Sequence, residues 1–162
     1  LTAHVGRMKR EAVTLIDGTP PEACAHGTFL APHAFEIDRL DRLEREVFGP
    51  VLHVIRWSHG HLDRVLESIE ATGYGLTLGV HTRIDRTART IAARMPVGNI
   101  YVNRNMIGAV VGVQPFGGEG LSGTGPKAGG PHYLHRFAAE RTVTVNTTAA
   151  GGNTSLVSLT EE

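Results

Sequence analysis

Apolar side chains recur along the chain with two different periods, and the alternation between these periods predicts the secondary structure. Leu1, Val5 and Met8 have helical spacing and predict the end of a helix. The apolar run 12–16 follows directly and predicts a strand. A connection rich in proline and glycine then leads to a second predicted strand near Phe29.

The rest of the chain alternates between strands and helices. Apolar runs predict strands over 50–57, 75–82, 99–103 and 141–147. Helical spacing predicts an amphipathic helix with Leu62, Val65, Leu66 and Ile69 on one face, a second helix carrying Ile84, Ala88, Ile91 and Met95, and a short helix near 133–139. Thr82 and Asp85 resemble a capping box before the second of these helices.

This order of elements favours an α/β fold. Strands joined by crossover helices form a mixed or mainly parallel sheet with helices on its faces. We assign residues 1–148 to one domain, and we place the small and polar segment 149–162 outside it as a tail.

Composition narrows the class of protein. The 162 residues suffice for one domain with a real core. Sixteen basic and sixteen acidic residues cancel, so no long-range field favours nucleic acid, and no apolar run reaches the ~20 residues that a membrane span needs. The single cysteine, Cys24, excludes an intrachain disulfide framework and fits a reducing compartment, so we expect a cytoplasmic protein. Because the chain opens on Leu1 instead of methionine, we expect its natural N-terminus to lie upstream.

Two patterns match known binding motifs without their context. Gly118, Gly120 and Gly123 have the G-x-G-x-x-G spacing of a dinucleotide-binding turn, which needs a strand directly before it and a helix directly after it. Pro115 and Pro126 interrupt both flanks, so we interpret these glycines as a tight loop. The nine histidines offer no third ligand at a convincing spacing, and no metal site is predicted.

Three segments taken together are typical of one enzyme superfamily. They are "EREVFGPVLHV" (44–54), "YGLTLGVHT" (74–82), and "VGNIYVNRN", which runs into "QPFGGEGLSGTG". In this order they resemble the C-terminal part of the aldehyde dehydrogenase superfamily, over nearly the whole chain. "GAVVGVQPFGGEGLSGTGPKAGGPHYLHRF" and "NTTAAGGNTSL" are most similar to the L-glutamate γ-semialdehyde (pyrroline-5-carboxylate) dehydrogenase module of bifunctional proline utilization A.

This resemblance implies an activity. Such enzymes oxidise L-glutamate γ-semialdehyde to L-glutamate with NAD, which is the second step of proline catabolism, and we expect the full-length protein to be a homo-oligomer. FAD would be needed only in a proline dehydrogenase module, which this chain does not contain. The resemblance does not decide whether the cofactor is NAD or NADP.

The resemblance also implies site residues. Glu46 matches the glutamate whose carboxylate binds the nicotinamide ribose hydroxyls, and Phe48 matches the aromatic residue near the nicotinamide ring. Gly108 and Ala109 match the loop that anchors the substrate carboxylate through backbone N–H groups. Phe116 matches the aromatic residue that packs on the aliphatic part of the substrate, and an ordinary core phenylalanine is an equally good interpretation of it.

No catalytic residue is assigned within the chain. The family's nucleophilic cysteine and general-base glutamate are expected upstream of Leu1, because Cys24 lacks the G-x-C context and no E-L-G-G-like context occurs. We therefore expect the isolated chain to be inactive. Two alternatives stay open: a non-enzymatic assembly module that pairs its last strand, 141–147, with another subunit, and a dehydrogenase for another aldehyde.

Overall fold

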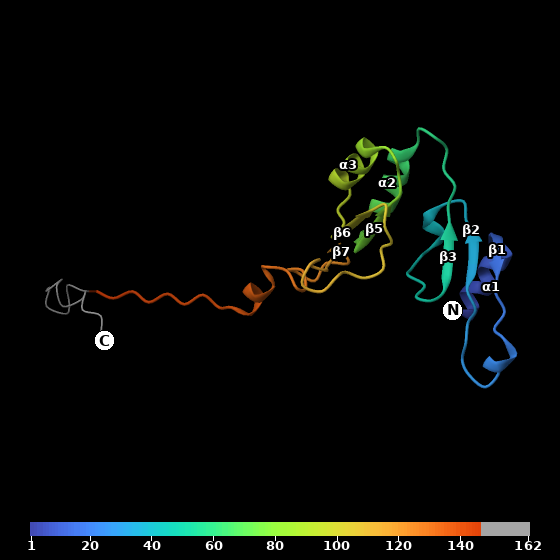
Figure 1. The fold of residues 1–162 in the computed structure, drawn as a ribbon, viewed down its shortest axis with the longest axis horizontal. Helices are drawn as coiled ribbons and strands as arrows, with labels where there is room; N and C mark the ends of the chain where they lie inside the picture. The colour runs from blue at the N-terminus through green and yellow to red at the C-terminus, as the bar shows by residue number, and fades with distance from the viewer. Residues whose placement is uncertain (147–162) are drawn as a thin grey trace.

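A computed structural model describes residues 1–146 and shows two folded bodies followed by an extended segment (Figure 1). The first body contains α1 (Thr2–Glu11), β1 (Val13–Asp17), β2 (His33–Glu36), β3 (Val51–Val54) and two short 3-10 helices, η1 (Glu22–Cys24) and η2 (Leu40–Arg42). The second contains α2 (Leu62–Glu70), β4 (Tyr74–Gly75), β5 (Thr77–Val80), α3 (Asp85–Arg94), β6 (Asn99–Val102) and β7 (Glu119–Gly120). A third 3-10 helix, η3 (Tyr133–Phe137), precedes the extended segment.

The first body is a three-stranded sheet with α1 packed beside it. β2 lies in the middle, antiparallel to β1 and parallel to β3. The apolar spacing of α1 turns Val5 and Met8 toward β2, where they form a buried cluster with Phe35 and Ile37. Met8 and Phe35 are fully buried, so this contact is the centre of the first core.

The second body has its own core around a β-α-β unit. β5 and β6 are parallel neighbours, and α3 is the crossover helix between them. Leu66 of α2 packs with Val80, Ile91 and Met95. The predicted apolar faces are therefore buried, except at Ile84, which precedes α3 and is 61% exposed.

The α/β class with a mixed sheet is confirmed, but one strand prediction is wrong. Phe29 lies in a loop and is 61% exposed, and the strand begins four residues later, at His33. Pro32 explains the shift, since proline has no N–H for a ladder. The first donor after it, the His33 N–H, bonds the Pro50 carbonyl at 2.9 Å. The strands also form three small sheets instead of one.

Two further predictions are wrong, one about the start of a helix and one about the last strand. α3 begins at Asp85 without a side-chain cap, because the Thr82 hydroxyl accepts from the Ile84 N–H (3.1 Å), one residue ahead of the helix. The predicted final strand has no strand assignment over 141–146, where Val143 and Val145 are 75% and 72% exposed. Thr147 and the boundary proposed at 148 lie outside the described residues.

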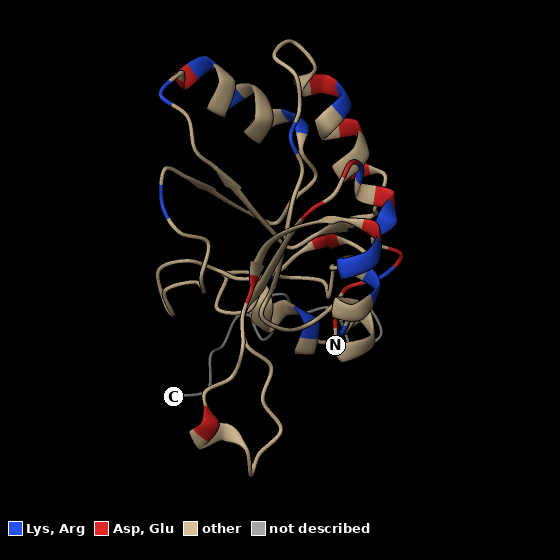
Figure 2. Cartoon of the chain, turned by 90° about the vertical axis from the view of Figure 1, so that its right-hand side faces the viewer, with Lys and Arg blue, Asp and Glu red and all other residues tan. Residues whose placement is uncertain are grey.

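Charge is distributed over both bodies. Figure 2 shows acidic and basic residues interleaved along the helices, so no long run of one sign follows a helix. Within residues 1–146, no helix is long and apolar enough to cross a membrane.

Candidate functional site

Glu46 and Phe48 line a pocket of about 460 Å³ against the start of α1. The other lining residues come from the same two segments: Leu1, Ala3, His4, Arg7, Glu44, Arg45 and Val47. Phe48 is 87% exposed, and Glu46 is exposed as well. Glu46 makes no hydrogen bond or ion pair with any residue of 1–146, so both carboxylate oxygens are available as acceptors.

A histidine pair connects this pocket to the sheet. The Nε2 atoms of His4 on α1 and His53 on β3 are 2.9 Å apart. Burial lowers the pKa of His4, and the positive charges of Arg7 and Arg45 lower it further. Burial also lowers the pKa of His53, with His4 and Arg7 adding to the effect. Neutral imidazoles suit this contact, because one ring must donate while the other accepts.

The loop 104–114 of the second body contains Gly108 and Ala109. Gly108 has a left-handed backbone conformation (φ +65°), which favours glycine. A Cβ added there would meet no atom within 4 Å, so the chain is open to solvent at this point. The N–H groups of Ile107 and Val110, on either side, donate to side-chain oxygens of the loop at 3.4 and 3.0 Å. Within the described chain, the Gly108 and Ala109 N–H groups donate no hydrogen bond. Two consecutive donors are therefore left available.

The surroundings of these donors suit a ligand that has a charged end and an apolar part. The Tyr101 hydroxyl donates to the Gly108 carbonyl at 3.5 Å, which ties the loop to β6. Ile107, Val111 and Val113 of the same loop are 85%, 95% and 73% exposed, so apolar side chains are available close in sequence to these donors. Backbone N–H groups bind a carboxylate roughly twice as strongly as a neutral acceptor.

Phe116 lies at the start of the glycine-rich loop and is half-buried. Its backbone forms an antiparallel bridge with Ala128, with N–H to carbonyl distances of 3.0 and 2.9 Å. No helix begins directly after Gly123, and the Gly75 N–H donates to the Ser122 hydroxyl at 3.2 Å. The interpretation of these glycines as a tight loop is confirmed.

The structure groups the predicted residues into two sets, one in each body. Glu46 and Phe48 share one pocket, whereas Gly108, Ala109 and Phe116 lie on loops of the second body. Across residues 1–146, no hydrogen bond or ion pair joins the two sets. Sequence reasoning missed His4 and Arg45 as pocket residues, because the pocket forms between segments distant in sequence and neither residue has a local signal.

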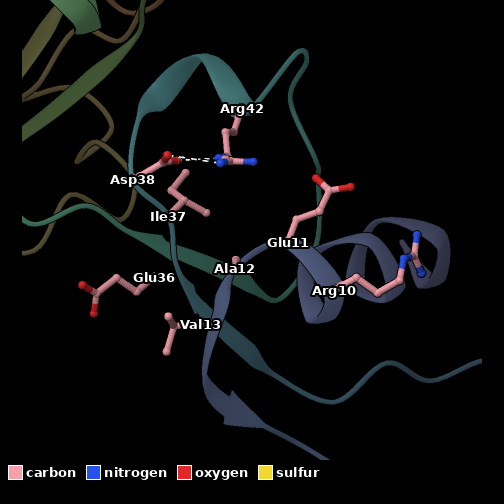
Figure 3. Close-up of a pocket in the computed structure, with 8 residues that line it drawn as sticks. All are labelled: Arg10, Glu11, Ala12, Val13, Glu36, Ile37, Asp38 and Arg42. Carbon is pink, nitrogen blue, oxygen red and sulfur yellow. Dashed lines mark hydrogen bonds and ion pairs between the residues drawn. The ribbon is translucent and has the colours of Figure 1, made fainter.

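A second hollow, of about 420 Å³, lies between the start of β1, the end of β2 and η2 (Figure 3). Asp38 and Arg42 pair there, and this hydrogen-bonded ion pair holds the pKa of Asp38 at about 2. Figure 3 shows Glu36 and Arg10 pointing to opposite sides, away from that pair. The hollow contains none of the predicted site residues, and its charges do not converge on one point.

Cys24 lies half-buried in η1, away from both sets of residues. In the part of the chain that the structure describes, no three histidine, cysteine, aspartate or glutamate residues are grouped to hold a metal ion.

Comparison with known proteins places these features in a family. The model of the aldehyde dehydrogenase family matches residues 2–143, which is most of the chain. The chain belongs to the aldehyde dehydrogenase family. Within this family it is 65% identical over 116 residues to bifunctional protein PutA of Klebsiella aerogenes, covering 72% of this chain and 9% of that protein. It is 37% identical over 145 residues to 1-pyrroline-5-carboxylate dehydrogenase of Bacillus pumilus, covering 88% and 27%.

Solved aldehyde dehydrogenase structures share the fold. A mutant of proline utilization A (PutA) from Bradyrhizobium japonicum superposes with a TM-score of 0.84 at 65% identity, covering 93% of this chain and 15% of that one. 1-Pyrroline-5-carboxylate dehydrogenase from Thermus with bound NAD gives 0.73 at 39% identity, covering 83% and 26%. This chain thus spans a minor part of each relative's length, 9% of the Klebsiella protein and 27% of the Bacillus protein.

Proposed function

We propose that this chain is the C-terminal part of an NAD-dependent L-glutamate γ-semialdehyde dehydrogenase domain that acts in proline catabolism. The similarity to PutA and to 1-pyrroline-5-carboxylate dehydrogenases supports this class of substrate. The observation that carries the proposal is the pair of open amides at Gly108 and Ala109, between two neighbouring amides that are already bonded. A loop built in this way offers its two free donors to one anion.

The substrate carries such an anion at the end remote from the aldehyde. Its α-carboxylate accepts from the Gly108 and Ala109 N–H groups, and the lack of a side chain at Gly108 lets it come close. The half-buried ring of Phe116 packs on the methylene groups between the two ends. Binding at both places fixes the distance at which the aldehyde projects from the loop.

The pocket beside α1 fits part of a nicotinamide dinucleotide. Glu46 has two free carboxylate oxygens, which suit the two hydroxyls of a ribose, and the exposed ring of Phe48 offers a face to a planar base. NAD, when bound, supplies the hydride acceptor for the oxidation. The relative from Thermus with bound NAD supports this choice of cofactor. The nucleophilic cysteine and the general base are assigned to sequence outside this chain.

Ala109→Pro tests the substrate assignment in the full-length enzyme, because proline removes one anchoring N–H. A hydrogen bond to a charged group contributes about 1.5–3 kcal/mol, so we expect the KM for glutamate semialdehyde to rise about 10- to 100-fold. The KM for propanal, which has no carboxylate, should stay within about twofold. Ala109→Ser keeps the N–H and is the matched control. An equal loss for both aldehydes would instead favour a dehydrogenase for another aldehyde.

Glu46→Gln tests the cofactor assignment. The substitution preserves size and removes the charge, so the KM for NAD should rise while the KM for the aldehyde stays unchanged. Glu44→Gln is the control, since Glu44 lines the same pocket but its carboxylate lies 4.0 Å from the Arg7 guanidinium and already has a partner.

The isolated chain should show no semialdehyde oxidation, and turnover above background would contradict the assignment of the nucleophile to another segment.

A second candidate function, assembly, is favoured by the extended segment after η3. Figure 1 shows this segment running away from the second body, and Val143 and Val145 are exposed with alternating spacing. An extended stretch can add as a strand to a sheet of another subunit. Deleting 141–147 from the full-length protein should then lower the mass measured by analytical ultracentrifugation while turnover is retained. An unchanged mass would exclude this role.

A further inference from the structure

Asn99, the first residue of β6, connects that strand to the loop that carries Phe116. Its side-chain Nδ2 donates to the Pro115 carbonyl at 3.1 Å, and its Oδ1 accepts from the Gly117 N–H at 3.3 Å. These two backbone groups lie on either side of Phe116. One side chain therefore holds the peptide units before and after the aromatic residue.

The two bonds fix the orientation of the Asn99 amide. The Pro115 carbonyl needs a donor, and the Gly117 N–H needs an acceptor. If the amide were turned over, its oxygen would face the Pro115 carbonyl, which also accepts, and its nitrogen would face the Gly117 N–H, which also donates. Gly117 is buried, so its N–H would have no ready access to water without Asn99.

The backbone around Phe116 is also held from the opposite side. Phe116 itself forms the bridge with Ala128, and the ammonium of the neighbouring Lys127 donates to the Gly98 carbonyl, directly before Asn99. The loop is thus closed onto β6 by a side chain at each end. Because the Phe116 backbone is fixed on both sides, the direction of its ring follows from these contacts.

We infer that Asn99 is a positioning residue that sets the place of the Phe116 ring for the substrate chain. The inference rests on the proposed function, in which this ring packs on the methylene groups of the semialdehyde. Asn99 touches neither substrate nor cofactor in this arrangement and acts only through Phe116. A displacement of about 1 Å in a positioning group can cost up to about 100-fold in catalytic efficiency (kcat/KM), so the effect should be measurable.

The chain offers a matched control at Asn103. Asn103 makes the same pair of bonds to a different partner: Oδ1 accepts from the Thr82 N–H and Nδ2 donates to the Thr82 carbonyl, both at 2.9 Å. Asn103 also has a left-handed backbone (φ 54°), so its replacement by alanine perturbs folding at least as much as the same change at Asn99. It does not contact the residues beside Phe116.

The experiment compares Asn99→Ala, Asn99→Asp and Asn103→Ala in the full-length enzyme. Hydrogen exchange of the peptide that contains 115–118, read by mass spectrometry, reports whether the loop has loosened. For Asn99→Ala we expect faster exchange, a KM for glutamate semialdehyde about tenfold higher, an unchanged kcat, and a less than twofold change for acetaldehyde, which is too short to reach Phe116. Asn99→Asp keeps the bond from Gly117 but sets a carboxylate oxygen against the Pro115 carbonyl, so it should raise the exchange and the KM as well.

Several results would overturn the inference. Exchange at 115–118 that stays unchanged in Asn99→Ala would show that Asn99 does not hold the loop. Faster exchange with an unchanged KM would show that the loop does not position the substrate, and an equal KM rise in Asn103→Ala would show a general loss of stability. The proposed function fails by a different result: an unmodified enzyme that does not oxidise glutamate semialdehyde.

Discussion

Gly98→Ala tests the close approach between β6 and the loop that carries Phe116. Gly98 is not among the glycines with positive φ, so alanine fits its backbone angles and the effect is steric alone. An added Cβ would lie 1.8 Å from the Gly117 carbonyl oxygen and 2.9 Å from the Gly118 Cα. Both are backbone atoms, which cannot rotate out of the way as a side chain can.

The size of the loss follows from these distances. Ordinary contact begins at 3.4 Å, so the Gly117 carbonyl would have to retreat by about 1.6 Å (3.4 − 1.8). Overpacking of this kind costs about 1–3 kcal/mol. The retreat also lengthens the 3.3 Å bond from the Gly117 N–H to Asn99, which is worth about 1 kcal/mol. We expect the free energy of unfolding to fall by about 2–4 kcal/mol.

Urea unfolding of the chain, followed by circular dichroism, measures this loss against a matched substitution. Gly6→Ala is the control, because its Cβ would lie 3.8 Å from the Arg10 guanidinium, in ordinary contact. A loss below about 0.5 kcal/mol in the free energy of unfolding of Gly98→Ala would show that β6 and the loop do not lie as close as described. It would also refute the contacts that hold the backbone on both sides of Phe116.

Three further outcomes follow from the packing. Gly6→Ala should raise the free energy of unfolding by about 1 kcal/mol in urea titrations, since alanine favours the interior of α1. Phe35→Ala should lower it by about 3–5 kcal/mol in the same titrations, because this ring is fully buried in the first core. Burial lowers the pKa of His4 and His53, so the unfolded chain binds protons more readily and stability falls as pH drops below the ordinary histidine value of 6.5. His53→Gln should reduce this fall in urea midpoints measured between pH 5 and 8, and an unchanged fall would contradict the role of His53.

Local patterns predicted the helices of the second body well. The apolar faces of α2 and α3 repeat over two turns or more, and Leu66 and Ile91 are buried as their spacing indicates.

Features that depend on distant contacts could not be predicted from short patterns. The strand near Phe29 has the right composition, but Pro32 and the ladder partner Pro50 determine where pairing starts. The pocket beside Glu46 depends on α1 packing against a segment about forty residues away in sequence, so no local pattern indicated that His4 lines it. Long-range pairing sets the register of a strand, and this information is missing from a window of ten residues.

The two sets of site residues differ in what holds them, and this difference matters for the proposed reaction. The open amides at Gly108 and Ala109 are flanked by bonds within their own loop, and the Tyr101 hydroxyl ties that loop to β6. The pocket at Glu46 instead depends on the packing of α1 through Met8 against β2. If the proposed roles are right, a substitution in the first core should weaken binding of the proposed cofactor together with stability, because the pocket at Glu46 loses its support. A substitution in the loop 104–114 should instead change binding of the proposed substrate carboxylate and leave the first core intact.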